Sequence, residues 1–152
     1  MKIFTTICLI FFSLTAFSAS IKIIGPCSAA PFSEKQIVID DLKTNVGQIT
    51  VSYLLEEKIP FAGDEFGIGS INNSAVGDDA IEVLSDTELR AYGWCYTINN
   101  IIADQMPNDT FLTNYQDSII WFYAFSTYSM GEWSNYCTPA YTLHSPKFCS
   151  LK

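Results

Sequence analysis

Apolar and polar residues alternate with a period of two in two segments of the second half of the chain. The segments are GWCYTINN at 93–100 and DSIIWFY at 117–123, and each has a tryptophan two positions before a tyrosine. This period is typical of β-strands, in which neighbouring side chains point to opposite faces of a sheet. We therefore predict strands at 94–99 and 118–128, with a turn at 107–109 between them.

Two segments nearer the amino terminus have a similar pattern. QITVSYLL at 48–55 alternates throughout, and FGIGSI at 66–71 follows a break at 60–63. We predict that these segments form the first and second strands. The Asn-Asn-Ser sequence at 72–74 is typical of a turn after the second strand.

The pattern changes after Gly77 to the spacing of a helix. From 79 to 91, apolar residues recur at intervals of three and four positions, among them Ala80, Val83, Leu84 and Ala91. Asp78 or Asp79 could cap the first turn, and Gly93 could end the helix because glycine readily takes the left-handed conformation of a helix stop. The predicted order is strand, strand, helix, strand, strand, which is an α+β fold.

The first 18 residues have the parts of a secretory signal peptide. Lys2 provides a positive start, residues 3–12 are almost continuously apolar, and small residues follow at 16–18. We predict cleavage after Ser18 or Ser20. A membrane anchor would need about 20 apolar residues, and this run ends sooner. We therefore expect a secreted or periplasmic protein without membrane insertion after cleavage.

Cleavage would remove one cysteine and leave Cys27, Cys95, Cys137 and Cys149. An even number of cysteines in an exported protein favours two disulfides. Three pairings are possible and the sequence does not choose among them. We favour Cys95 with Cys137 and Cys27 with Cys149, because the second bridge would hold an amino-terminal arm at 21–47 and a carboxy-terminal extension at 129–152.

Composition limits the classes of partner. The chain has 16 acidic and 8 basic residues, a net charge of −8, and losing Lys2 would leave 7 minus 16, or −9. Nucleic acids and anionic membranes recruit basic surfaces, so we expect neither as a partner. With 49% hydrophobic residues, the roughly 130 mature residues can bury one core, which predicts a single domain.

Several motifs between 48 and 128 resemble the β-grasp family related to the C-terminal domain of transcobalamin and intrinsic factor, whose bacterial members are mostly uncharacterised secreted proteins. The family has a glycine before an apolar helix, a Gly-Trp-x-Tyr-x-Val-Asn-Gly strand and a Gly-Asp-apolar-x-Trp-x-Tyr strand. The matching residues are Gly77, Gly93, Trp94, Tyr96, Ile98, Asn99, Asp117, Ile119, Trp121 and Tyr123. Asn100 and Gln116 replace two family glycines. Asparagine tolerates positive φ, whereas Gln116 must take an ordinary turn conformation.

The resemblance implies a β-grasp-like fold over 48–128, with a four-stranded mixed sheet packed on one helix. In transcobalamin and intrinsic factor the corresponding domain helps to cover a corrinoid held largely by a second, helical domain. It therefore implies a non-catalytic module that binds a small ligand, with corrinoid-like molecules among the candidates. The candidate ligand-binding residues are Tyr96, Asn99, Trp121, Tyr123 and Trp133.

Two alternatives to this hypothesis remain open. Aromatic residues on one face of a sheet are more often core or cross-strand pairs, and we expect this of Trp94 and Trp121. An exposed aromatic patch or a sheet edge could also serve a secreted interaction or structural domain that binds another protein.

The sequence has no catalytic or metal-binding constellation, so we expect no enzyme activity and no cofactor. His144 is the only histidine, and no Cys-x-x-Cys pair occurs. The adjacent acids Asp78 and Asp79 are better explained by the dipole of the predicted helix than by catalysis.

Overall fold

The computed structural model describes residues 18–144 and 147–149. The predicted signal peptide therefore lies outside the described residues, apart from Ser18. The fold is α+β and mostly sheet. Its elements are β1 Ala19–Ile24, β2 Ser33–Ile37, α1 Val46–Glu56, β3 Phe61–Asp64, β4 Gly67–Ile71, the short 3₁₀ helix η1 Gly77–Ala80, β5 Ile81–Ser85, β6 Glu88–Ile98, β7 Ile101–Ile102, β8 Ser118–Ser129, β9 Glu132–Pro139 and η2 Ala140–Thr142.

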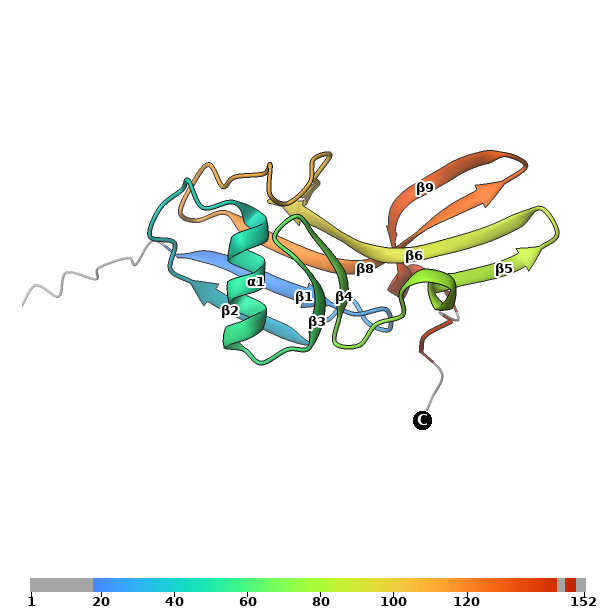
Figure 1. The fold of residues 1–152 in the computed structure, drawn as a ribbon, viewed down its shortest axis with the longest axis horizontal. Coiled ribbons are helices and arrows are strands. Elements are labelled where there is room, and N and C mark those ends of the chain that lie inside the picture. Colours follow the sequence, from blue (N-terminus) through green and yellow to red (C-terminus); the bar gives the residue numbers. More distant parts are fainter. Residues whose placement is uncertain (1–17, 145–146, 150–152) are drawn as a thin grey trace, which may run out of the picture.

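The 12-residue strand β8 is the axis of the main sheet. Along one edge it pairs with β6 over the whole length of that strand, antiparallel. Along its other edge the first half of β8 pairs with β1, in parallel, and the second half pairs with β9, antiparallel. The sheet thus has two parts, one ordered β2-β1-β8-β6 and one built from β9, β8, β6 and β5 (Figure 1).

Helix α1 covers one face of the first part of the sheet (Figure 1). Its buried side chains pack with those of β1 and β8 in one core cluster, which includes Ile21, Ile23, Ile49, Leu54, Ile119 and Trp121. The loop at 107–110, which contains the predicted turn, accepts hydrogen bonds from the first two N–H groups of the helix. Val46 N donates to Thr110 O, and Gly47 N donates to Pro107 O. The Asn45 side chain accepts from Gln48 N at 2.8 Å. These bonds satisfy donors that have no partner within the helix.

The strand predicted at 48–55 is wrong, because this segment is α1. Its β-branched residues and its alternation favour a strand locally. In the structure Ile49, Thr50, Tyr53 and Leu54 are buried together, and this is the i, i+1, i+4, i+5 pattern of one helical face. Packing against the sheet therefore overrides the local preference.

The helix predicted at 79–91 is also wrong. One short 3₁₀ turn, η1, is followed by the antiparallel hairpin of β5 and β6. Glu82 lies opposite Arg90 in this hairpin, and their side chains form an ion pair at 3.2 Å. No side chain caps η1, and Gly93 lies inside β6 opposite Ala124 rather than at a helix end. Most of the segment predicted to be a helix at 79–91 therefore belongs to the sheet, because β8 is long enough to pair with all of β6.

The predictions of a four-stranded sheet and of an amino-terminal arm at 21–47 are corrected by the pairing of β1 with β8. Among the described residues the main sheet has seven strands, with a separate two-stranded sheet of β3 and β4. The extension at 129–152 also contributes β9 to the main sheet. Parallel pairing of β1 needs a long crossover, which leaves no short-range signal in the sequence.

The predictions of three strands and of two disulfides are confirmed. Strands β4, β6 and β8 include or overlap the strands predicted at 66–71, 94–99 and 118–128. Asn100 has a φ of +66°, a conformation that asparagine tolerates. The favoured disulfides, Cys27–Cys149 and Cys95–Cys137, are both present. No helix in the described part of the chain has the length and apolar character to cross a membrane.

Candidate ligand pocket

Two of the predicted ligand-binding residues, Tyr96 and Trp121, lie in the core under α1. Their rings stack with centroids 4.9 Å apart, and they are 6% and 2% exposed. The Trp121 indole donates to Thr50 Oγ1 at 2.9 Å, and the Tyr96 hydroxyl donates to Gln105 O at 2.8 Å. Burial raises the pKa of Tyr96. These contacts connect the sheet to the helix and to the following loop.

Asn99 shapes the turn after β6. It has a φ of +52°, its Nδ2 donates to Asp117 Oδ1 at 2.8 Å, and its Oδ1 accepts from Ser118 N at 2.9 Å. Burial opposes the charged form of Asp117, but the hydrogen bonds from Asn99, Asn114 and Thr113 together outweigh it and lower the pKa of this carboxyl. The amide of Asn99 therefore holds the start of β8.

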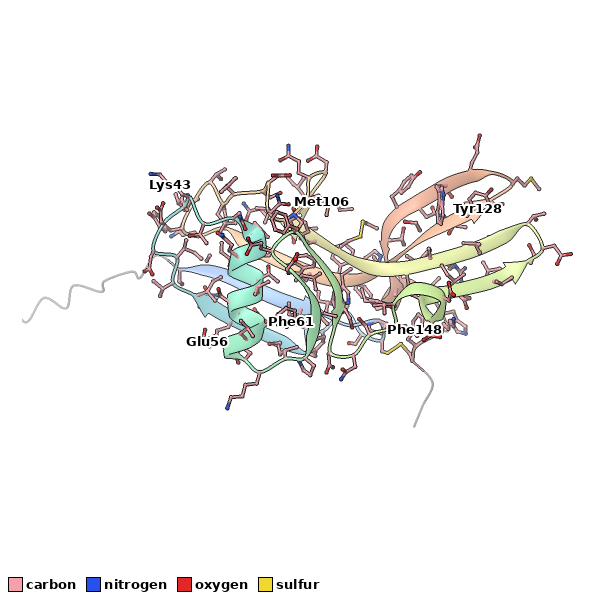
Figure 2. The ribbon with its side chains drawn as sticks, in the orientation of Figure 1. Lys43, Glu56, Phe61, Met106, Tyr128 and Phe148 are labelled. Carbon is pink, nitrogen blue, oxygen red and sulfur yellow. A yellow bond between two sulfur atoms is a disulfide. The ribbon has the colours of Figure 1, made fainter. Side chains whose placement is uncertain are left out.

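Trp133 lies on the other face of the sheet from Tyr123. In the β8–β9 register Trp133 is opposite Tyr128, and Tyr128 and Tyr123 are five positions apart on β8, so their side chains point to opposite faces. Figure 2 labels Tyr128 and Phe148 on the two sides of β6 and β8. The five candidate residues therefore do not form one surface patch.

Tyr123, which is itself fully buried, and Trp94 form part of the wall of a cavity of about 450 Å³, which we call the aromatic pocket. They face each other across β8 and β6 with ring centroids 5.5 Å apart. The pocket lies beside Trp94, which packs against both core clusters of the molecule. Its lining residues are Gly25, Pro26, Phe32, Ile71, Asn72, Asn73, Ser74, Ala75, Asp79, Trp94, Tyr123 and Phe148.

The turn at 72–75 holds both of these rings by their polar atoms. Trp94 Nε1 donates to Ser74 Oγ at 2.7 Å, and the Tyr123 hydroxyl donates to Ala75 O at 3.0 Å. The turn is left-handed at Asn72 and Asn73, with φ of +54° and +58°, and asparagine tolerates this conformation. Burial raises the pKa of Tyr123 to about 12, so its hydroxyl is a hydrogen-bond donor at neutral pH.

Phe148 completes the wall from the carboxy-terminal segment. Its ring stands edge-on to Tyr123, with centroids 5.6 Å apart, and to Tyr92, with centroids 5.0 Å apart. The Cys27–Cys149 disulfide joins this segment to the β1–β2 connection, which contributes Gly25, Pro26 and Phe32 to the pocket. Figure 2 shows Phe148 below the strands beside η1. The disulfide therefore holds two walls of the pocket together.

The polar groups of the pocket are few. Asn72, Asn73 and Asp79 are exposed at its lining. Ser74 is already occupied, since its Oγ accepts from Trp94 and also contacts Ser70 Oγ. Within residues 18–144 and 147–149, no group of His, Cys, Asp or Glu side chains is placed to hold a metal ion.

Sequence reasoning missed Phe32 and Phe148, although Trp94 and Tyr123 were singled out by their strands. Phe32 lies five positions after Cys27, and Phe148 immediately precedes Cys149. Given the favoured pairing of these cysteines, the two phenylalanines could have been placed in one neighbourhood. Nothing in the sequence places that neighbourhood beside Trp94.

The opposite face has a shallower hollow of about 310 Å³. Small residues of β6 and β8 form its floor, and the rings of Trp133 and Tyr136 stand at its side, 44% and 67% exposed. The Cys95–Cys137 disulfide joins β6 to β9 at this hollow. The floor residues are Ala91, Gly93, Ala124 and Ser126. Trp133, the one exposed aromatic ring among the predicted ligand-binding residues, therefore lies at the side of this hollow.

Comparison with known proteins gives little support for any relationship. No protein-family model and no curated protein matches the chain. A solved structure from Ruminococcus gnavus, described as a "putative metal binding protein", is 13% identical with a TM-score of 0.46 and covers 70% of this chain and 94% of its own. A likeness this weak carries no argument about the fold or the ligand of the present chain.

Proposed function

We propose that this chain is a secreted or periplasmic, non-catalytic module that binds a small ligand in the aromatic pocket. The observation that carries the proposal is the convergence on one cavity of about 450 Å³ of four aromatic side chains from separate segments, Phe32, Trp94, Tyr123 and Phe148. Ligand sites are typically concave and largely apolar, with volumes of roughly 300–1,000 Å³ and a few polar groups that orient the ligand. The exposed amides of Asn72 and Asn73 can supply that orientation.

The location is supported by the two disulfides, which persist in oxidising compartments. Cys27 is itself exposed, so a reducing environment would have access to one of them. The predicted signal peptide at 1–18 agrees with export. Strand β1 begins at Ala19, which favours cleavage after Ser18 over cleavage after Ser20, because the second cut would remove two strand residues.

We further propose that the chain is a β-grasp domain of the transcobalamin-like kind. When β3, β4, β5, β7 and β9 are left out, the remaining elements β1, β2, α1, β6 and β8 follow the strand, strand, helix, strand, strand order that the resemblance implies, although other segments fill the first three places. The resemblance keeps a corrinoid-like molecule in the ligand screen, but a whole corrin macrocycle is larger than this pocket, so only part of such a ligand could enter it. The pocket volume is at the lower end of the usual range, which favours a ligand with one ring or a fused pair of rings.

The test is a ligand screen of the oxidised mature protein, with cobalamin included, read by thermal shift and then by the indole N–H signals of ¹⁵N-labelled protein. A ligand at 100 times its dissociation constant adds about 2.7 kcal/mol to stability, which is a shift of several degrees for a domain of this size. We expect a binding ligand to move the Trp94 signal and to leave Trp121, which is buried under α1. Ligands that raise the melting temperature without moving Trp94 would argue against this pocket.

A matched pair of phenylalanine variants then tests whether the wall of the aromatic pocket contacts the ligand. Phe32 lines the pocket and is 46% exposed, whereas Phe66 is 59% exposed and lies outside the pocket. Both can be cut to alanine without a large cavity in the core. We expect Phe32→Ala to weaken binding of a screen hit and Phe66→Ala to leave it unchanged; equal effects would contradict the proposal.

The second candidate function is protein binding at the hollow beside Trp133 and Tyr136. The observation that favours it is the exposure of two large aromatic rings on a hairpin braced by Cys95–Cys137, since such rings are common at protein interfaces. Replacement of both by alanine should abolish co-purification of a partner from the native compartment. A retained partner would remove this candidate.

A further inference from the structure

We infer that the ligand of the aromatic pocket carries a positive charge, on an amine or a quaternary ammonium group. The inference rests on the proposed function and names its ligand class. It follows from the charge of the lining, from the aromatic rings and from the position of a lysine on the same wall.

The charge of the lining is negative. Asp79 is the one formally charged residue among those that line the pocket. It is exposed, and no basic side chain in the described ranges forms an ion pair with its carboxylate. The whole chain has a net charge of −8. The exposed Asp79 carboxylate would repel an anionic ligand and attract a cationic one. The basic group on the same wall, the Lys147 ammonium, is held by the backbone carbonyls of Asp79 and Ile81.

The aromatic rings favour a cation independently of Asp79. The face of an aromatic ring is negative, and cations bind within about 6 Å of the ring centroid. The rings of Trp94, Tyr123 and Phe148 meet at steep angles, 63° for the first pair and 82° for the second. Trp94 and Phe148 are partly exposed and can contact an alkylammonium group, whereas Tyr123 is fully buried and packs against both of them.

The chain already places one of its own cations against this wall. Lys147 Nζ lies 5.3 Å from the centroid of the Phe148 ring. It donates to Asp79 O at 3.2 Å and to Ile81 O. Lys147 does not line the pocket, and its ammonium is bound by backbone carbonyls, which leaves the Asp79 carboxylate for a ligand. The rim of the pocket thus stabilises an ammonium group in the unliganded chain.

The experiment compares three probes of one shape and different charge: choline, its neutral isostere 3,3-dimethyl-1-butanol, and the anion 3,3-dimethylbutanoate. Each is titrated at constant ionic strength into ¹⁵N-labelled oxidised protein, and the three indole signals are followed. We expect choline to shift the Trp94 signal with saturation. The neutral isostere should bind about five- to tenfold more weakly, and the anion should bind least.

Neighbouring residues offer matched controls. Asp79→Asn should weaken choline binding several-fold, whereas Asp78→Asn, an exposed acid in the same 3₁₀ turn that does not line the pocket, should not change it. Lys147→Met removes a like charge from the rim and should strengthen choline binding about twofold. Lys43→Met is its control, because Lys43 lies at one end of the molecule, away from Phe148 (Figure 2).

The outcomes separate this inference from the proposed function. Equal or tighter binding of the alcohol or the anion overturns the inference and leaves the pocket as a binding site. If none of the three probes moves Trp94 but a hit from the wider screen does, a cationic hit supports the inference and a neutral or anionic hit overturns it. If nothing in either experiment moves Trp94, both proposals fail.

Discussion

Trp94 and Tyr123 face each other across β6 and β8, with ring centroids 5.5 Å apart, and both donate a hydrogen bond to the same turn. Trp94 Nε1 bonds to Ser74 Oγ and the Tyr123 hydroxyl to Ala75 O. The turn that follows β4 is therefore fastened to the centre of the main sheet, although β4 itself pairs in a separate sheet. This connection sets the shape of the aromatic pocket.

Trp94→Phe should destabilise the fold by about 1 kcal/mol or more, because the hydrogen bond to Ser74 is lost together with one of the two fused rings of the indole. The free energy of unfolding in urea measures the effect. Trp133→Phe is the control, since Trp133 is 44% exposed and should change stability by less than about 0.5 kcal/mol. Equal losses in the two variants would show that the Ser74 bond does not stabilise the fold.

Removing either disulfide should destabilise the chain, but only one removal should disturb the pocket. The bridged cysteines are 122 positions apart in Cys27–Cys149 and 42 apart in Cys95–Cys137. Chain entropy then predicts losses of about 5 and 4 kcal/mol for the paired serine variants. Phe148 is next to Cys149, so the first variant should also weaken binding of a pocket ligand. Retained affinity in that variant would show that the bridge is not needed to hold the pocket wall.

Gly47→Ala should be strongly destabilising even though alanine is normally preferred to glycine inside a helix. A Cβ atom at this position would lie 1.9 Å from Glu65 O, so the backbone of α1 or of the β3–β4 turn would have to move. We expect a loss of about 2 kcal/mol or more. Gly93→Ala is the matched control, because a Cβ there meets nothing within 4 Å, and it should be close to neutral. The melting temperatures of the two variants measure the difference.

Stability should fall at alkaline pH as buried tyrosines lose their protons. Burial raises the pKa of Tyr123 to about 12, and burial, followed by the hydrogen bond to Glu82, raises the pKa of Tyr92 to about 12. Tyrosine in an unfolded chain has a pKa of about 10. Because the folded-state pKa values are raised, the protonated tyrosines contribute fully to the free energy of unfolding below pH 10. This contribution is lost as the pH rises from 10 to 12.

Urea unfolding at intervals between pH 8 and 12 measures this loss. Tyr123→Phe removes one titrating group and should flatten the profile above pH 10. Tyr136→Phe is the control, because Tyr136 is 67% exposed and its replacement should leave the profile unchanged. A Tyr123→Phe profile as steep as that of the original chain would contradict the assignment.

Local sequence patterns predicted a strand best where each of its two faces keeps the same kind of surroundings along the whole strand. In the Trp-x-Tyr segment of β6, large residues on the pocket and helix side alternate with smaller ones on the other side, whereas in β8 the second face also has Ile120 and Phe122. The pattern in 48–55 also alternates, yet it forms α1, because β-branched residues such as Ile49, Thr50 and Val51 are read as strand by local preference. The helix is distinguished by the burial of Ile49, Thr50, Tyr53 and Leu54 on one face, where Thr50 accepts a hydrogen bond from Trp121.

By itself the sequence determined the α+β class, the strands at the centre of the sheet, two disulfides and a set of aromatic candidates. Tertiary structure decided which segment is the helix, that β1 joins the sheet beside β8, and which aromatic rings meet. Tyr96, Trp121 and Tyr123 are all buried in the core, and Tyr123 together with Trp94, Phe32 and Phe148 also lines a pocket. The reason is physical: alternation is a property of neighbouring residues, but a pocket depends on contacts between distant segments, fixed here by parallel strand pairing and a disulfide.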